Sequence, residues 1–253
     1  MTGPLTGRVV LVTGAAGGIG RAIAARLAAD GARVAVHHLP GDAAEEATAA
    51  DLAARLGGIA VAADVRDATQ VAGMVDQVRE RLGPVSGLVC AAAASVAGRG
   101  DWRQLTAGDW ADVLAVNVTG AFLCVQAAYP DLVATGNGAI VLFSSVTPLL
   151  GRTGNLHYVT SKAAIIGMTR SLAREAGPDA VRVNAIAPGA IRTPAEAVYG
   201  TAEEVADAMY AVQALRRRGE PSDVAAVTSF LLGADAGFVT GQLLVVDGGW
   251  VMP

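Results

Sequence analysis

The chain has 253 residues, of which 53% are hydrophobic, 17% are charged and only 4% are aromatic, and its formal net charge is -4. This composition suits buried strands covered by alanine-rich helices, and the length is compatible with one α/β domain over residues 1–253. The sequence lacks a basic stripe and a long uncharged apolar run, so we expect no nucleic-acid or membrane partner and a cytoplasmic location.

A glycine-rich turn follows the first predicted strand, residues 9–12. Its sequence is Thr13-Gly14-Ala15-Ala16-Gly17-Gly18-Ile19-Gly20, and a helical pattern at residues 21–30 comes next. Glycines in such a turn let a pyrophosphate approach the free N–H groups and the positive dipole end of the helix. The turn therefore predicts a dinucleotide site with contacts from Gly14, Ala16, Gly17, Gly18, Ile19 and Gly20.

The second predicted strand, residues 34–36, ends at His37-His38-Leu39-Pro40. Sites that prefer NAD usually carry an acidic residue here, which binds the ribose 2′-hydroxyl. We therefore predict that His38 and Leu39 border the adenosine ribose, that both NAD and NADP are admissible, and that NADP is favoured. A protonated His38 would attract a 2′-phosphate, although no arginine beside it offers a bidentate contact.

The third predicted strand, residues 59–62, is followed by Asp64-Val65. The Asp64 carboxylate can accept a hydrogen bond from the adenine amino group, or it can cap the next helix, and both alternatives stay open. The fourth predicted strand, residues 87–91, contains Cys90, and a later helix contains Cys124. Both cysteines are interpreted as unpaired, buried thiols.

Two polar residues stand out in the next apolar elements. Asn117 lies inside a predicted apolar helix, residues 113–127, where a buried amide must find partners and a structural role is the alternative to a catalytic one. Ser145 follows the fifth predicted strand, residues 139–143, at the edge where a parallel sheet presents ligands. Its hydroxyl can donate to a carbonyl oxygen or bond to the backbone of its own turn.

The segment Tyr158-Val159-Thr160-Ser161-Lys162 opens another helical pattern and carries the predicted chemistry. A spacing of four residues places the phenol and the ammonium on one helix face. A nearby ammonium stabilises the phenolate, so Tyr158 is predicted to act as acid and base. Lys162 is the only lysine among 19 basic residues, the other 18 being arginines, which indicates that a compact ammonium is needed at this position.

Two further strands, residues 181–186 and 243–246, complete a predicted set of seven joined by crossover helices. This alternation is typical of a single doubly wound Rossmann-type domain with a seven-stranded parallel sheet. Residues 193–219 interrupt the alternation after the sixth strand and are predicted to form a substrate lid. A fixed packing helix is the alternative for this segment.

Several motifs in this order resemble the short-chain dehydrogenase/reductase family over residues 13–249. Residues 13–20 resemble its glycine-rich turn, Tyr158 to Lys162 its YxxxK motif, and Ser145 its catalytic serine. Asn117 falls where the family keeps a catalytic asparagine. The segment Asn184-Ala185-Ile186-Ala187-Pro188-Gly189 and the C-terminal Val246-Asp247-Gly248-Gly249 are also similar to family motifs.

The resemblance implies an NAD(P)-dependent oxidoreductase that transfers a hydride between the cofactor and an alcohol or ketone. In this mechanism Tyr158 exchanges a proton with the substrate oxygen, Ser145 bonds the same oxygen, and Lys162 holds the nicotinamide ribose. Asn117 holds a water that relays protons from Lys162 to solvent. Tyr158 and Lys162 therefore count among the cofactor contacts too, with Ala91, Ala92, Ala93, Pro188, Gly189, Ile191 and Thr193. The expected substrate contacts are Ser95, Thr147, Asn155 and Tyr158.

One motif departs from the family pattern, because Cys90-Ala91-Ala92-Ala93 stands where Asn-Asn-Ala-Gly is usual. We expect the change to affect local stability more than chemistry. A non-catalytic dinucleotide-binding regulator and a 3-oxoacyl-carrier-protein reductase remain as alternatives to a ketoreductase of free small molecules. The absence of Lys and Arg from residues 129–139 is interpreted as disfavouring an acidic carrier protein. No metal site is predicted, and a homo-oligomer, as a dimer or a homotetramer, is expected.

Overall fold

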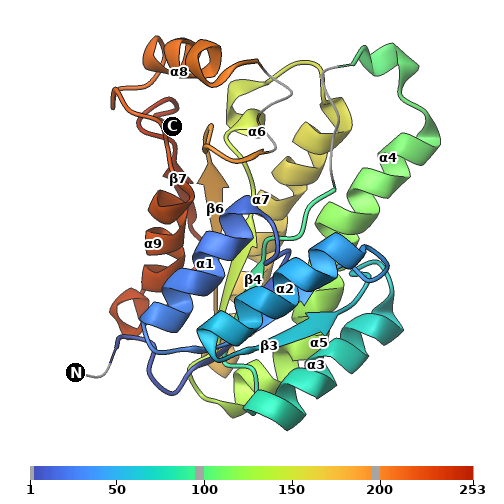
Figure 1. The fold of residues 1–253 in the computed structure, drawn as a ribbon, viewed down its shortest axis with the longest axis vertical. Coiled ribbons are helices and arrows are strands. Elements are labelled where there is room, and N and C mark those ends of the chain that lie inside the picture. The colour runs from blue at the N-terminus through green and yellow to red at the C-terminus, as the bar shows by residue number, and fades with distance from the viewer. Residues whose placement is uncertain (1–2, 95–99, 195, 197–199, 253) are drawn as a thin grey trace.

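The fold centres on a seven-stranded parallel sheet (Figure 1) in a computed structural model that describes residues 3–94, 100–194, 196 and 200–252. The strand order is β3-β2-β1-β4-β5-β6-β7. The order reverses between β1 and β4, which is the point where doubly wound sheets bind ligands. This confirms the predicted fold class. The strands are β1 Val9–Thr13, β2 Arg33–His38, β3 Ile59–Ala62, β4 Gly87–Cys90, β5 Ala139–Phe143, β6 Arg182–Pro188 and β7 Leu243–Val246.

Helices cover both faces of the sheet. On one face, side chains of α1, α2 and α9 share a core with the strands, and on the other face α3, α5 and α7 do so. The main helices are α1 Gly18–Ala29, α2 Ala43–Leu56, α3 Ala68–Leu82, α4 Ala107–Leu114, α5 Ala121–Ala134, α7 Leu156–Ala176 and α9 Pro221–Leu232. The shorter ones are η1 Trp102–Gln104, α6 Thr147–Leu150, η3 Gly177–Asp179, α8 Ala202–Tyr210 and η5 Ala234–Ala236.

The central strands are buried on both faces because alternate side chains enter different cores. Along β1, Val10 and Val12 join the core under α1 and α9, whereas Val9 and Leu11 join the core under α3 and α5. All five residues of β1 and all five of β5 are buried. Continuous runs of Val, Ile and Leu are therefore strands here, as expected for a covered parallel sheet.

The helix predicted over residues 113–127 is longer and less regular than the sequence indicated. It runs from α4 through a π-helical turn, η2 Ala115–Gly120, into α5, so that helical backbone is continuous over residues 107–134. Thr106 and Asp109 form a reciprocal capping box that fixes its start. Among the described residues, this is the one helical stretch long and apolar enough to cross a membrane, and a single such helix is weak evidence for a span.

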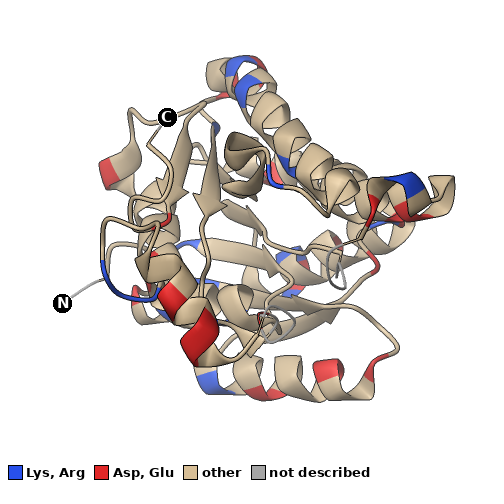
Figure 2. Cartoon of the chain, turned by 90° about the horizontal axis from the view of Figure 1, so that it is seen from above, with Lys and Arg blue, Asp and Glu red and all other residues tan. Residues whose placement is uncertain are grey.

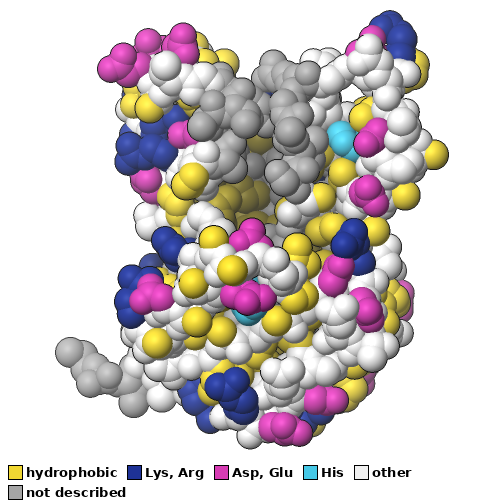
Figure 3. All heavy atoms as spheres, turned by 45° about the vertical axis from the view of Figure 1, so that its right-hand side comes forward, with side chains coloured by type: hydrophobic (Ala, Val, Ile, Leu, Met, Phe, Trp, Pro, Cys, Tyr) yellow, Lys and Arg dark blue, Asp and Glu magenta, His cyan; other side chains and the backbone are white. Residues whose placement is uncertain are grey.

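The carboxyl ends of the strands open toward one edge of the sheet, to which the chain adds α6 and α8 (Figure 1). Seen toward this edge, most Lys, Arg, Asp and Glu residues lie on the surrounding helices and loops and the strands are almost free of them (Figure 2). Acidic and basic side chains are also interspersed on the face shown in Figure 3. The edge that receives a ligand is thus formed mainly by backbone and uncharged side chains.

Candidate active site

The glycine-rich turn connects β1 to α1 at the point where the sheet order reverses. Gly14 has φ +64°, and a Cβ built on it would lie 2.8 Å from Ala92 Cα. A Cβ on Gly20 would lie 2.2 Å from the Gly14 carbonyl oxygen. Any side chain at these two positions would force the turn away from β4 or from its own helix, so glycine is required there.

The N-terminus of α1 is suited to a phosphate. Its N-cap residue is Gly17, which offers no side-chain cap to the first-turn N–H groups. These donors and the helix dipole attract an anion. A Cβ on Gly18 would lie 2.9 Å from Thr193 Cγ2, so the turn and the segment after β6 lie against each other. The structure thus brings together two of the predicted cofactor segments.

The predicted adenosine contacts lie at the ends of β2 and β3, which are hydrogen-bonded neighbours. His38 is buried, and its Nδ1 lies 3.1 Å from the carbonyl oxygen of Leu39, which is exposed. Asp64 does not cap the following helix, because Asp67 accepts the hydrogen bonds from the first N–H groups of α3. The helix-cap alternative for Asp64 is therefore wrong, whereas the adenine contact stays a prediction.

Asp64 forms an ion pair with Arg66. The Arg66 guanidinium donates to both carboxylate oxygens at 2.6 to 3.0 Å, and the Arg66 backbone N–H donates to Oδ1 at 3.0 Å. The hydrogen bonds from the Arg66 side chain keep the pKa of Asp64 below its usual value. Arg66 is exposed and Asp64 is partly exposed, so the pair contributes little to stability and a ligand can compete for either partner. The sequence analysis did not identify Arg66.

Ser145 lies at the carboxyl end of β5 and is buried. Its Oγ accepts a hydrogen bond from the backbone N–H of Thr147 at 3.2 Å. This turn contact uses a lone pair and leaves the Ser145 hydroxyl hydrogen available for a substrate oxygen. The Thr147 Oγ1 is itself buried without a partner among the described residues. Among the described residues, neither hydroxyl in this turn donates a hydrogen bond.

Lys162 is anchored to β5 from α7. Its Nζ donates to the Phe143 carbonyl oxygen at 2.9 Å, and the Ser144 hydroxyl donates to the Lys162 carbonyl oxygen at 2.7 Å. Burial lowers the pKa of Lys162 from 10.5 to about 8. The ammonium has three donors, so two remain for a ribose diol.

Tyr158 precedes Lys162 by one helical turn. The ammonium lies 5.6 Å from the centroid of the phenol ring, as the four-residue spacing predicts. Since the Lys162 ammonium bonds to Phe143 of β5 and its backbone carbonyl oxygen bonds to Ser144, the helix α7 that carries Tyr158 is held against the end of β5, which Ser145 follows. The sequence predicted the proximity of Tyr158 and Lys162 from their spacing, whereas the family resemblance implied that of Tyr158 and Ser145.

Asn117 lies in the π-helical turn η2 and links three segments. Its Oδ1 accepts from the Ala94 N–H at 2.8 Å, and its Nδ2 donates to Ser161 Oγ at 2.9 Å. The Ser161 hydroxyl donates in turn to the Tyr158 carbonyl oxygen at 2.7 Å. The amide thus has the structural partners that its burial requires. One amide hydrogen and one acceptor position stay available, and the water-relay role stays a prediction.

The segment Cys90-Ala91-Ala92-Ala93 stays close to the glycine-rich turn despite its departure from the family pattern. The Ala92 N–H donates to Thr13 Oγ1 at 3.2 Å, which couples the ends of β1 and β4. Cys90 and Cys124 are both free and buried, as predicted. The pKa of the Cys90 thiol is raised by its contact with Cys124 and by burial, which keeps it protonated.

The segment after β6 holds the predicted Pro188, Gly189, Ile191 and Thr193. The Pro188 carbonyl oxygen accepts from the Val146 N–H at 3.2 Å, which joins this segment to the turn that follows Ser145. The buried Arg218 pairs with Glu196 at 2.5 Å and connects the start of the predicted lid to its end. The helix α8 lies within the predicted lid, residues 193–219.

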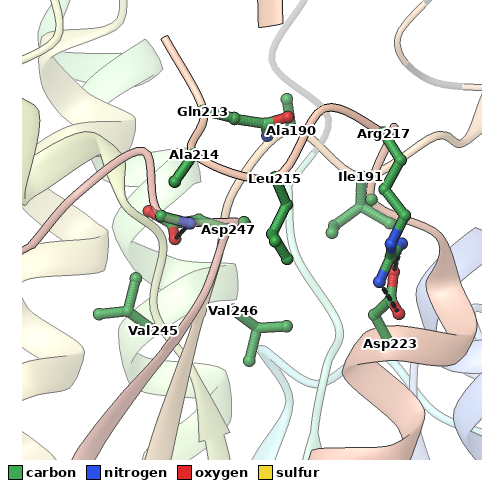
Figure 4. Close-up of a pocket in the computed structure, with 13 residues that line it drawn as sticks. Ala190, Ile191, Gln213, Ala214, Leu215, Arg217, Asp223, Val245, Val246 and Asp247 are labelled. Carbon is green, nitrogen blue, oxygen red and sulfur yellow. Dashed lines mark hydrogen bonds and ion pairs between the residues drawn. The ribbon is translucent and has the colours of Figure 1, made fainter. Parts of the chain in front are cut away.

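Thr147, a predicted substrate contact, is the first residue of α6. Asn155, another predicted substrate contact, lies immediately before α7, the helix that carries Tyr158 and Lys162. Ser95 lies outside the described residues. A cavity of about 470 Å³ opens nearby, between the ends of β6 and β7 and residues 213–219, and is bordered by Gln213, Asp247 and the Arg217–Asp223 ion pair (Figure 4). None of the predicted catalytic residues lines this cavity.

The lack of Lys and Arg in residues 129–139 does not bear on the docking of a carrier protein, because these residues lie at the edge of the sheet opposite to Ser145. These residues connect the end of α5 to the start of β5, whereas Ser145 follows the other end of β5. In Figure 1 the lower end of the molecule carries α5, and the upper end carries α6 and α8. The local lack of Lys and Arg therefore says nothing about what docks at the catalytic edge.

Comparison with known proteins agrees with the fold and the motifs. A family model described as "Enoyl-(Acyl carrier protein) reductase" matches residues 14–251. A (3R)-3-hydroxyacyl-CoA dehydrogenase of Mus musculus is 37% identical over 98% of both chains. A 3-oxoacyl-[acyl-carrier-protein] reductase of Staphylococcus aureus is 35% identical over 96% of this chain and 97% of its own.

A short-chain dehydrogenase/reductase of Armillaria gallica is 40% identical over 97% of this chain and 96% of its own. A crystal structure assigned to a short-chain alcohol dehydrogenase of Sinorhizobium meliloti superposes with a TM-score of 0.88 at 36% identity and covers 97% of each chain. These relatives cover nearly the whole chain, and the solved structure shares its fold. The chain is therefore an NAD(P)-dependent oxidoreductase of the short-chain dehydrogenase/reductase family.

Proposed function

We propose that this enzyme interconverts an alcohol and a ketone on a small-molecule substrate, with Tyr158 as the acid/base and NADP favoured over NAD. The observation that carries the proposal is the environment of Ser145. Its Oγ accepts one hydrogen bond from the Thr147 N–H, which leaves its hydrogen available for a substrate oxygen. A hydroxyl donor at the end of β5, opposite a tyrosine and a buried ammonium, matches the needs of carbonyl reduction.

The nicotinamide cofactor supplies or accepts the hydride when it is bound. Tyr158 gives a proton to the substrate oxygen during reduction and takes it back during oxidation. Ser145 donates to the same oxygen and stabilises the negative charge that develops on it. The two unused donors of Lys162 are available to the nicotinamide ribose, and its charge favours the ionised phenol. Asn117 keeps the Tyr158 turn in register through Ser161.

The preference for NADP rests on the missing acid at the end of β2. His38 provides no charge that repels a 2′-phosphate. The exposed guanidinium of Arg66, which pairs with Asp64, offers a donor on the neighbouring loop. The variant His38→Asp should shift the ratio of kcat/KM for NADP and NAD toward NAD by about 1 to 3 kcal/mol. An unchanged ratio in a parent that already prefers NAD would overturn this assignment.

A 3-oxoacyl thioester is the second candidate substrate. Two relatives are named for 3-hydroxyacyl-CoA and 3-oxoacyl-carrier-protein substrates, and both substrates place the reacting oxygen on the third carbon of an acyl thioester. The unpartnered Thr147 hydroxyl next to Ser145 offers a donor for a second carbonyl oxygen. A free ketone lacks that second group.

Oxidation of NADPH and NADH should be followed with small ketones, acetoacetyl-CoA and a 3-oxoacyl-carrier protein in parallel. A higher kcat/KM with free ketones supports the first candidate, and a higher value with either thioester supports the second. The variant Thr147→Val should lower thioester turnover selectively if its hydroxyl binds the second carbonyl. Cofactor binding without any consumption across the panel would indicate a regulatory protein instead.

A further inference from the structure

His37 occupies a buried position between the two loops that face the dinucleotide. The side chain is 3% exposed and lies at the end of β2, one residue before the position that distinguishes NAD from NADP. Its Nδ1 is 3.0 Å from the backbone nitrogen of Gly14, and its Nε2 is 2.9 Å from the carbonyl oxygen of Ala63. The imidazole therefore spans the distance between the glycine-rich turn and the loop after β3.

These contacts allow one protonation state of the ring. Gly14 N–H is a donor, so Nδ1 must accept, and the Ala63 carbonyl oxygen is an acceptor, so Nε2 must carry the hydrogen. The ring is therefore the neutral Nε2–H tautomer. A proton on Nδ1 would place two N–H groups against each other. In agreement with this, burial lowers the pKa of His37 from 6.5 to about 4.

The backbone of the same residue completes the connection. The Ala15 N–H donates to the His37 carbonyl oxygen at 3.0 Å, so His37 receives hydrogen bonds from two consecutive residues of the turn. On the other side, the Ala63 N–H donates to the His38 carbonyl oxygen at 3.2 Å. The first residue after Ala63 is Asp64, the predicted adenine contact.

We propose that His37 is a positioning residue for the dinucleotide, holding the glycine-rich turn and the loop after β3 at the separation that the adenosine diphosphate half requires. The proposal rests on the NAD(P) binding of the family. The turn has little freedom to adjust by itself, because Gly14 lies against Ala92 and Gly20 lies against Gly14. A displacement of the Gly14 N–H therefore moves the first amides of α1, which are the pyrophosphate donors.

Three variants test the two hydrogen bonds of the His37 ring separately. His37→Ala removes both of them. His37→Asn keeps an acceptor near the Nδ1 position for Gly14, and His37→Gln keeps a donor near the Nε2 position for Ala63. Val36→Ala is the matched control, because Val36 is a fully buried neighbour in β2 and its truncation weakens packing without removing a hydrogen bond to either loop.

The measurement is the dissociation constant of NADPH, NADH and ADP-ribose by fluorescence titration or calorimetry, with kcat for NADPH oxidation at saturating cofactor. We expect His37→Ala to weaken all three ligands by about tenfold, the free energy of one or two hydrogen bonds, with kcat little changed. His37→Asn and His37→Gln should each restore part of the affinity. ADP-ribose lacks the nicotinamide, so its loss assigns the effect to the adenosine diphosphate half.

Affinities for His37→Ala within twofold of the parent would overturn the proposal. So would an equal loss of affinity in Val36→Ala at the same loss of thermal stability, since that result would mean general destabilisation. If His37→Ala does not fold, the dissociation constants of His37→Asn and His37→Gln, compared with those of Val36→Ala, still test the proposal. Failure of the parent itself to bind any dinucleotide would contradict the family assignment rather than the role of His37.

Discussion

The Lys162 side chain connects the helix that carries Tyr158 to strand β5 of the sheet. The Lys162 ammonium is buried and reaches the last residue of β5, and the phenol lies one turn earlier on the same helix. This arrangement separates two functions that single substitutions can test. In the proposed mechanism the phenol hydroxyl exchanges the proton, and the ammonium positions the phenol and the ribose.

Tyr158→Phe removes only the hydroxyl that exchanges the proton. We expect kcat to fall by about 10² to 10⁴, the usual contribution of a positioned acid or base, with cofactor affinity nearly unchanged. Steady-state kinetics and NADPH titration measure the two quantities. Turnover close to that of the parent would remove Tyr158 from the proton-transfer role.

Lys162→Arg keeps the charge but changes its shape. The Lys162 Nζ is buried and donates to the Phe143 carbonyl oxygen at the end of β5, where a planar guanidinium cannot reproduce both this bond and contacts to a ribose. We expect a loss of turnover and weaker cofactor binding. Parent-like kinetics would mean that any cation serves and that the single lysine of the chain has no special role.

The protonation of His37 gives the folded protein a specific acid sensitivity. Its pKa in the folded state, about 4, is below the unfolded value of 6.5, so the neutral ring stabilises the fold fully above pH 6.5. This contribution is lost as the pH falls from 6.5 toward 4, and amounts to on the order of 3 kcal/mol. His38, beside it on β2, and Asp64, after β3, are the charged or titratable groups that act on its ring.

Urea unfolding of the parent and of His37→Gln at several pH values between 7 and 4.5 tests this sensitivity. Carboxylates titrate in both proteins, so the difference between the two isolates the histidine. We expect the free energy of unfolding of the parent to fall more steeply than that of the variant. Parallel curves would show that His37 is protonated equally in the folded and unfolded states.

At the scale of elements, the π-helical turn between α4 and α5 determines where Asn117 points. A π-helical turn inserts one extra residue per hydrogen bond, and such turns often occur at functional sites. Here the turn directs the amide toward Ala94, after β4, and Ser161, on α7. Three segments that are distant in sequence are thereby held by one side chain.

Asn117→Ala should therefore affect stability as well as turnover. The substitution leaves the Ala94 N–H and Ser161 without their shared partner in a buried site, which costs about 1 to 3 kcal/mol. We expect a lower thermal midpoint and a lower kcat. Thermal unfolding and kinetics should be compared with Asn117→Asp, which keeps the acceptor for Ala94. A variant as stable as the parent would indicate that η2 holds its geometry without this amide.

At the scale of the whole molecule, large hydrophobic side chains remain exposed on its outer helices. Phe122 on α5 is 44% exposed, Phe230 on α9 is 43% exposed and Phe238 is fully exposed. Phe122 and Phe230 lie on helices that cover different faces of the sheet, and Phe238 lies in the turn after η5. Apolar surfaces of this kind usually mark interfaces. Two separate patches are compatible with a tetramer that has two kinds of two-fold contact.

We therefore predict a homo-oligomer in solution. Light scattering at micromolar concentration should give a mass of two or four chains, and Phe122→Glu or Phe230→Glu should each dissociate one kind of contact. A monomeric parent at that concentration would contradict the prediction. A parent-like mass in both variants would place the contacts elsewhere on the surface.

The sequence by itself determined the strands, their parallel order and the main catalytic motif. These features are encoded locally, because continuous Val, Ile and Leu runs need burial on both faces and a four-residue spacing defines a helix face. The glycine-rich turn is equally local, since Gly14 and Gly20 are required by close backbone contacts within a few residues or with the adjacent strand. The seven strands, and with them the site edge, were therefore predictable.

Only the tertiary structure decided the contacts between segments that are far apart in the chain. The bond of Asn117 to Ser161 spans 44 residues and that of His37 to Ala63 spans 26, and neither follows from a local pattern. The π-helical turn was missed because its sequence is apolar and helical like its neighbours. Hydrogen bonds of buried polar groups depend on which segments the packed core brings together, and that information appears only once the chain has folded.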